Sequence, residues 1–482
     1  MGGMARSEPE AAARREEDRI VAVDAVEADR PPIRNEGGIA GYFKFDERGT
    51  TLPTEVRAGL TTFMVMAYII FVNANILGDP KGAAMDKVAV AAATALVAGV
   101  MTIIMGVVGN YPFALAAGLG INGIVSFSLA AGAGLGWQGA MGVIFWEGLA
   151  VTILVVVGLR EAIMDAIPLA LKRAIGVGIG LFILFIGFVS GGLIATPVGG
   201  FPPVSFVYPT TTGAFVTIIG LFVTIALFVL RIRGALILSI VVTTIIALVA
   251  GVATIPTNVV QSLSFSTLLG LDPFKVFSTL GIYVAILTIF SIMLIDFFDT
   301  MGTVTGVAEQ AGLATPDGKV PGVGRVLLVD SIAAMVGGLA GTSSNTTYIE
   351  SAAGVAEGGR TGLTAVVTGV LFLIAIVLAP LAGIVPSQAT APVLILVGFL
   401  MFTLIRDIDV TNVEDGIPAL LTMVLMPLTY DISIGIGAGF IAWTFIKVVR
   451  GKMAEIHPLM WVVSIAFLIF FAQDWIRPLL PK

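Results

Sequence analysis

The stretch IFSIMLIDFFDTMGTVTG, residues 289–306, decides how this chain is interpreted. Asp296 and Asp299 interrupt an apolar run that otherwise has the composition of a membrane span. An ionised aspartate near the centre of a bilayer costs at least about 2.5–3.5 kcal/mol, and such residues usually have a function. Residues three apart share one face of a helix. We therefore expect both carboxylates to face protein or a water-filled cavity rather than lipid.

The composition indicates an all-α polytopic membrane protein. Of the 482 residues, 57% are hydrophobic and 12% are charged, with a mean hydropathy of +1.02. Soluble domains have about 25% charged residues. The sequence contains no Cys, which excludes disulfides, thiolate metal sites and iron–sulfur clusters. His457 is the single histidine, so neither a histidine metal site nor a Ser–His–Asp triad is expected.

Residues 1–40 differ from the rest of the chain. They are charged, contain Pro31 and Pro32, are poor in aromatic residues and lack the apolar core of a signal peptide. We predict a disordered cytoplasmic tail.

Apolar runs of about 20 residues predict about 14 transmembrane segments in two sets of seven. The first set covers 57–78, 88–109, 112–130, 138–158, 171–191, 213–230 and 234–252. The second set covers 277–299, 325–341, 343–356, 361–380, 389–405, 415–430 and 431–449. The C-terminal part, 450–482, contains a further apolar piece at 458–474, which is either an interfacial helix or an extra span.

The two sets resemble each other in order. The similar pairs are 63–77 with 289–304, 110–126 with 341–357, and 173–192 with 391–407. Because seven is odd, the halves 41–252 and 277–449, joined by a linker at 253–276, are predicted to be inverted repeats. Inverted repeats with Gly-interrupted spans are typical of secondary transporters.

Basic residues indicate the orientation, since cytoplasmic loops are rich in Lys and Arg. They fall on one side if the N-terminus is inside: Lys44, Arg48, Arg57, Arg160, Lys172, Arg173, Arg231, Arg233, Lys319, Arg325, Arg360 and Arg406. Lys447, Arg450 and Lys452 join that side only if 415–449 forms two short spans, which the polar corner at 429–431 favours.

Three stretches look too polar or too broken for plain spans: 110–126, 341–357 and the opening stretch. Pro112 removes a helical hydrogen bond, so Phe113–Ala117 is expected to be extended, with a helix resuming near Gly118–Asn122. In the second stretch a better helix begins at Glu350. Half-helix N-termini present N–H groups and a partial positive charge. A flat polar ring fits such a slot, with the ring of Phe113 stacked on its face.

Each candidate also has a structural interpretation. Asp296 is either a buried carboxylate bonded to Thr or backbone donors for packing, or a functional one. Glu350 is either a helix-start residue stabilised by the dipole or a ligand-binding group, and Asn122 is either a cap or a binding residue. Asp330 sits near a span end, where charges are cheaper.

The sequence resembles the azaguanine-type branch of the nucleobase–cation symporter family, the adenine, guanine and hypoxanthine permeases. The matching motifs are GTTLPTEVRAGLTTFMVMAYIIFVNANIL (49–77), PFALAAGLGIN (112–122), LIDFFDTMGTVTGVAEQAGL (294–313), GTSSNTTYIESAAGVAEGGRTGL (341–363) and PALLTMVLMPLTYDISIGIGAGF (418–440). The resemblance implies 14 spans in two inverted repeats. A core domain (spans 1–4 and 8–11) stands against a gate domain (spans 5–7 and 12–14), with short extended segments in spans 3 and 10.

The resemblance also implies a function and its residues. It implies import of purine nucleobases across the plasma membrane by symport with a proton, or alternatively Na+, through an elevator-like movement of core against gate. A homodimer is compatible with it, and no cofactor or metal is implied. The residues to which it assigns substrate binding are Asp296, Glu350, Asn122, Phe113, Ala114, Ile349 and Thr347, and those for proton coupling are Asp296, Asp299 and Glu350.

Two rival functions remain open at this point. An anion or other small-solute carrier on the same architecture predicts a cation or bare helix termini at the site, whereas here carboxylates converge. An intramembrane aspartyl protease needs two Asp side chains facing each other from different helices, whereas Asp296 and Asp299 share one helix. The sequence therefore favours a transporter over an enzyme.

Overall fold

The computed structural model describes residues 37–158, 167–197, 203–255, 263–315 and 320–472. Almost all of the predicted tail, 1–40, lies outside these residues. The described chain is helical apart from two small strand pairs, and a short helix, α2 (Gly38–Phe43), precedes α3 (Phe45–Arg48) ahead of the first long helix.

Ten helices of the described residues are long and apolar enough to cross a membrane. They are α4–α5 (Leu52–Leu77), α6–η1 (Lys87–Gly109), α8 (Gly136–Val156), α10 (Leu169–Ser190), α11 (Thr212–Val229), α14 (Ile282–Gln310), α15 (Val323–Ala340), α17–η3 (Gly362–Gly383), α18–η4 (Ser387–Asp407) and α20 (Ile432–Val449). The shorter helices are α7 (Leu119–Gly123) continued by η2 (Ile124–Gly132), α12 (Ala235–Val249), α13 (Lys275–Leu280), α16 (Ser351–Ala356), α19 (Val413–Thr429), η5 (Met453–Glu455) and α21 (Pro458–Phe471). The chain therefore folds as an all-helical membrane protein.

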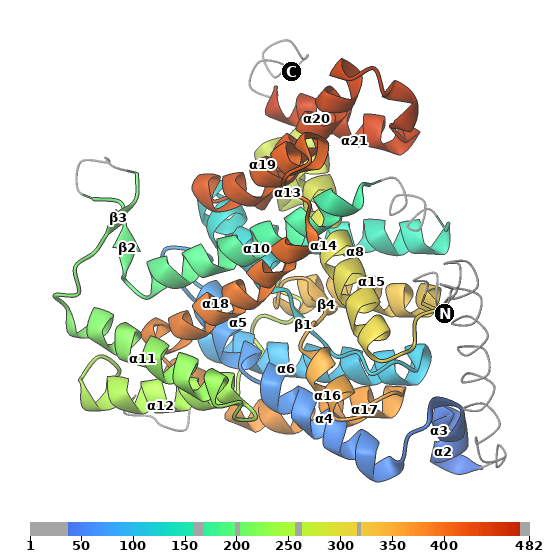
Figure 1. Ribbon diagram of the computed structural model, residues 1–482. Coiled ribbons are helices and arrows are strands. Elements are labelled where there is room, and N and C mark those ends of the chain that lie inside the picture. The colour runs from blue at the N-terminus through green and yellow to red at the C-terminus, as the bar shows by residue number, and fades with distance from the viewer. Residues whose placement is uncertain (1–36, 159–166, 198–202, 256–262, 316–319, 473–482) are drawn as a thin grey trace, which may run out of the picture.

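Helices from distant parts of the sequence pack together in two groups (Figure 1). In one group α6 and α4 lie against α17, and α8 lies against α15. In the other, α10 contacts α18 and α19, α19 contacts α20, and α11 pairs with α12. Two short strands follow α10, β2 (Ile194–Ala195) and β3 (Ser205–Phe206). Each group therefore combines helices from the N-terminal and the C-terminal halves of the sequence.

Buried carboxylates hold some helix ends together. Glu55, fully buried in α4, accepts hydrogen bonds from the backbone N–H and hydroxyl groups of Thr361 and Thr364 at the start of α17. The N–H groups of a first helical turn lack intrahelical partners, so Glu55 caps α17 from a neighbouring helix. Near the same end, Glu357 pairs with Arg57 at 3.2 Å and with Arg233 at 2.8 Å.

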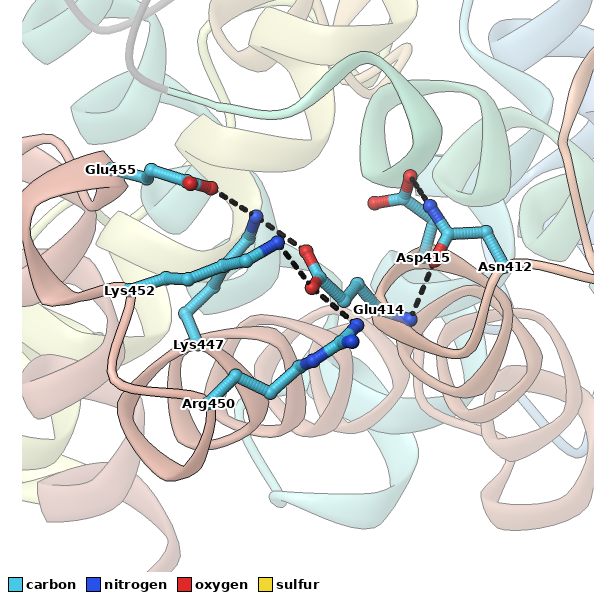
Figure 2. Close-up of polar contacts among 7 residues, drawn as sticks. All are labelled: Asn412, Glu414, Asp415, Lys447, Arg450, Lys452 and Glu455. Atoms are coloured by element: carbon cyan, nitrogen blue, oxygen red, sulfur yellow. Dashed lines mark hydrogen bonds and ion pairs between the residues drawn. The ribbon is translucent and has the colours of Figure 1, made fainter.

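A charged cluster centred on Glu414 joins α19 to the end of α20 and to η5 (Figure 2). Its carboxylate accepts from Lys447 (2.6 Å), Arg450 (2.5 Å) and Lys452 (2.6 Å), and Lys447 also donates to Glu455 (2.6 Å). The hydrogen bond from Lys447 holds the pKa of Glu455 below its usual value. The first turn of α19 is thereby tied to the end of α20 and to the connection that leads into α21.

Some boundaries differ from those that the sequence predicted. The predicted break in 415–449 is confirmed, because α19 ends at Thr429 and α20 begins at Ile432. The opening stretch, however, is not broken: α14 is one helix of 29 residues that continues through Thr300–Gly306. The polar residues there lie against other helices instead of interrupting this one. In the undecided piece 458–474, α21 has 14 residues, which is shorter than the about 20 that span a bilayer.

Candidate functional site

Two short strands meet in the interior of the protein. β1 (Leu115–Ala117) and β4 (Asn345–Thr347) are antiparallel, with Ala116 opposite Thr346. The ladder is extended by Gly118 N–H to Ser344 C=O (2.8 Å) and by Tyr348 N–H to Ala114 C=O (2.9 Å). Non-helical backbone at membrane depth is tolerated only where protein or a cavity satisfies it. The extended segments predicted in 110–126 and 341–357 therefore satisfy each other.

Each strand runs directly into a short helix. Gly118 precedes α7, and Glu350 precedes α16. Because the strands are antiparallel, the two helices leave from opposite ends of the strand pair. We call these the α7 end and the α16 end.

Asp330 of α15 anchors β4 through hydrogen bonds to Thr347. One carboxylate oxygen accepts from both the backbone N–H and the hydroxyl of Thr347 (2.9 Å each), and the other accepts from Thr300 of α14 (2.6 Å). The expectation that Asp330 sits near a span end is wrong, because it is fully buried within α15. The sequence signal that identifies it is a carboxylate inside an apolar span, the same signal that singled out Asp296.

α14 runs alongside β4 and places its two carboxylates at different points. Ser344 donates to Asp296 (2.8 Å), and Thr346 donates to Asp299 (3.4 Å). Asp296 is fully buried, whereas Asp299 is partly exposed. Asp296 therefore belongs to the α7 end of the strand pair and Asp299 to its middle.

The α16 end contains Glu350, which is partly exposed. The hydroxyl of Tyr68 donates to its Oε1 at 2.6 Å. Asp299 and Glu350 are close enough to interact electrostatically. The neighbouring Ile349 is 49% exposed. The structure thus brings Glu350 together with Asp299, while Asp296 lies toward the other end of β4.

Asn122 lies in α7 and is fully buried. Among the residues that the structure describes, neither Nδ2 nor Oδ1 of Asn122 has a hydrogen-bond partner. Nearly all buried polar side chains are hydrogen-bonded, so an exception needs an explanation. A bound ligand that pairs with the amide is one such explanation. In the described residues, Asn122 makes no cap hydrogen bond.

The other predicted contact residues already have partners within the protein. The ring of Phe113 is fully buried and stacks on Tyr111, with centroids 5.0 Å apart. The backbone N–H of Ala114 already donates a hydrogen bond to Ser351 Oγ at 3.0 Å. Thr347 is bound to Asp330. Their contacts with substrate stay predictions.

The geometry defines a class of protein. Two discontinuous segments cross inside a bundle of membrane helices, with carboxylates at the crossing. In the described residues, no group of three or more His, Cys, Asp or Glu side chains is arranged to hold a metal. The fold is that of a membrane transporter. It is similar to the transmembrane domain of the cyanobacterium bicarbonate transporter BicA (TM-score 0.60, 15% identity, 80% of this chain and 97% of that one). It is also similar to SLC26A9 (TM-score 0.62, 12% identity, 94% of this chain and 72% of that one).

Sequence comparison gives the family. Residues 53–438 match the Permease family, and the chain belongs to that family. It is 40% identical over 437 residues to the guanine/hypoxanthine permease PbuG of Bacillus subtilis, covering 89% of this chain and 98% of PbuG. It is 39% identical over 435 residues to the adenine permease AdeP of Escherichia coli, covering 90% and 96%. The protein is therefore a transporter and not an enzyme.

Proposed function

We propose that this protein imports purine nucleobases, namely hypoxanthine, adenine or guanine, together with a proton. The observation that carries this proposal is Glu350, a partly exposed carboxylate at the start of α16 with one oxygen held by Tyr68. Purine rings carry N–H groups that a carboxylate can accept. The names of the relatives at about 40% identity, guanine/hypoxanthine permease and adenine permease, support the same substrate class.

In this proposal the purine binds at the α16 end. Its ring N–H donates to Glu350, and its apolar face lies against the exposed side chain of Ile349. The first turn of α16 adds the partial positive charge of a helix N-terminus, which suits the carbonyl and ring nitrogens of the base. The backbone near Phe113 and Ala114 lies at the same end of the strand pair and contacts the base from the β1 side, whereas Asn122, at the α7 end, becomes a contact only when the core and the gate move.

The proton is carried by the α14 carboxylates. Asp296 is buried and bonded to Ser344, so it exchanges protons with water only when the surroundings move. A carboxyl group removed from water is easier to neutralise than one in solution. Because Asp296 and Glu350 are attached to the two ends of β4, protonation of one and ligand binding at the other act on the same strand.

The movement is a displacement of one helix group against the other. Spans 1–4 and 8–11 form the core and spans 5–7 and 12–14 the gate, within repeats at 41–252 and 277–449. The strong packing inside each group supports this division. A ligand shifts the equilibrium between two states only through its different affinity for them, so closure of the gate over the loaded core supplies the coupling.

In this proposal the protein lies in the plasma membrane and its N-terminus is on the cytoplasmic side. Three basic residues from different helices gather near one end of the bundle: Arg57 and Arg233 at Glu357, and Arg360 with its backbone bonded to Glu55. Clusters of Lys and Arg favour the cytoplasmic side.

The test is uptake of radiolabelled hypoxanthine and adenine by proteoliposomes, with and without a protonophore. We expect uptake that collapses with the proton gradient and persists when Na+ is replaced. Asp296→Ala and Glu350→Ala abolish it, whereas Asp409→Ala, which removes an exposed carboxylate in a loop, does not. Uptake indifferent to the gradient contradicts the coupling. Transport of bicarbonate in place of purine supports the anion-carrier alternative.

A further inference from the structure

A tyrosine that lies within the matching motif 49–77, but that the predicted site does not include, is bonded directly to Glu350. Tyr68 is fully buried, and its hydroxyl lies 2.6 Å from Oε1 although the two residues are 282 positions apart in sequence. Among the described residues this is the side-chain hydrogen bond that Glu350 receives. Tyr68 therefore contacts the candidate site directly.

The backbone explains how Tyr68 reaches this position. α4 (Leu52–Met66) and α5 (Ile69–Leu77) are separated by a tight turn at Ala67 and Tyr68. Ile70 N–H bonds to Ala67 C=O and Phe71 N–H to Tyr68 C=O, both three residues back, before the four-residue spacing resumes at Val72. A local tightening of this kind often marks a functional position in a helix.

The hydrogen bond constrains the chemistry of Glu350. A tyrosine hydroxyl has one hydrogen to donate, and a carboxylate has about four acceptor positions. With Tyr68 on Oε1, Glu350 is held as an acceptor, and its own backbone N–H also bonds to the carboxylate. The remaining acceptor positions suit a ligand N–H group and do not suit a ligand that offers only acceptors.

We propose that Tyr68 is a positioning and specificity-determining residue that fixes the rotamer and the accepting form of Glu350. This inference rests on the proposed function and adds to it the residue that keeps Glu350 in place to accept the ring N–H group of the base. It follows that the proton is carried by the α14 carboxylates and not by Glu350.

The first test compares Tyr68→Phe with Tyr348→Phe. Tyr348 is a matched control because it is also buried and near Glu350, but its hydroxyl donates to the Ala117 carbonyl. Since hydrogen bonds to charged groups are stronger than neutral ones, Tyr68→Phe raises the KM for hypoxanthine about tenfold with little change in maximal rate. The acid limb of its uptake–pH profile moves to higher pH. Tyr348→Phe leaves the pH profile unchanged. Equal behaviour of the two variants overturns the proposal.

A double-mutant cycle tests whether Tyr68 acts through Glu350. In a Glu350→Gln background we expect Tyr68→Phe to add less than about twofold to the loss in hypoxanthine affinity, because coupled residues are not additive. Independent, multiplying losses overturn the proposal.

A third measurement does not depend on purine transport. Infrared titration of the purified protein follows the protonated-carboxyl band that disappears in Glu350→Gln. In Tyr68→Phe this band persists to higher pH than in the wild type. If the wild type fails to transport purines, the proposed function fails but this titration still decides the role of Tyr68. An identical titration in both proteins overturns that role.

Discussion

The two ends of the β1–β4 pair differ in how far their side chains are exposed. At the α16 end, Ile349 is half exposed and Glu350 is partly exposed, and Asp299, at the middle of the pair, is partly exposed as well. At the α7 end, Asn122, Ser344 and Asp296 are fully buried. The same strand therefore connects a partly exposed end of the pair with a fully buried end.

In the proposed proton symport, this difference separates two tasks, binding of the base and transfer of the proton. The accessible end holds a carboxylate with acceptor positions to offer, as a binding site requires. The closed end holds a carboxylate bonded to the strand and an amide with no partner among the described residues. In the proposed mechanism, β4 moves as a unit anchored by Asp330. A change at one end of the strand is then transmitted to the other end.

The contrast in access is tested by labelling, and it is the largest effect expected. Because the chain has no native Cys, single-cysteine variants need no altered background. A charged, membrane-impermeant thiol reagent labels Ile349→Cys at least about 100-fold faster than Ile121→Cys, since a fully buried thiol reacts only through local opening.

A lipid-facing position provides the control for this labelling. Phe222 is 69% exposed on the apolar helix α11, so Phe222→Cys is exposed to lipid and resists a charged reagent. If Ile349→Cys behaves like Phe222→Cys, the α16 end faces lipid and the comparison between the two ends is lost.

The second prediction concerns affinity at the accessible end. Glu350→Gln removes the charge that accepts ligand N–H groups, and hydrogen bonds to charged groups contribute about 1.5–3 kcal/mol. We expect hypoxanthine binding, measured by calorimetry on purified protein, to weaken about 10- to 100-fold. Asp409→Asn is the control outside the site. Unchanged binding in Glu350→Gln moves the purine away from α16.

The sequence contained much of this arrangement. Pro112 and the run of Thr and Ser before Glu350 predicted both extended segments, because each is incompatible with a regular helix. The sequence did not reveal that the segments pair with each other, since Ala116 and Thr346 are 230 positions apart. It also missed Tyr68 and Asp330, because an aromatic residue in a span looks like packing and a carboxylate near a span end looks solvated.

The third prediction concerns the anchor between the two ends. Asp330→Asn replaces an acceptor-only carboxylate with a neutral amide, so the donors of Thr347 and Thr300 all lose a charged partner and at least one of them loses its acceptor. We expect a loss of about 1–3 kcal/mol in stability, seen as a lower thermal midpoint in detergent. Thr300→Val, which removes one of these bonds, has a smaller effect. A loss of proton coupling at unchanged stability contradicts the anchoring role.

The smallest effect is expected at Asn122, and its sign matters more than its size. A buried amide without a partner costs free energy, and replacing it with an apolar group of similar shape is nearly neutral or stabilising. Asn122→Leu is therefore expected to keep or raise the thermal midpoint while uptake of hypoxanthine falls. Asn73→Leu is the matched control, because Asn73 donates to Thr94 (2.8 Å) and to the Thr342 carbonyl (3.1 Å), and it lowers the midpoint. If Asn122→Leu destabilises the protein as much as Asn73→Leu does, the amide of Asn122 has a hydrogen-bond partner within the protein. The closed end of the strand pair then offers no unpaired group to a ligand.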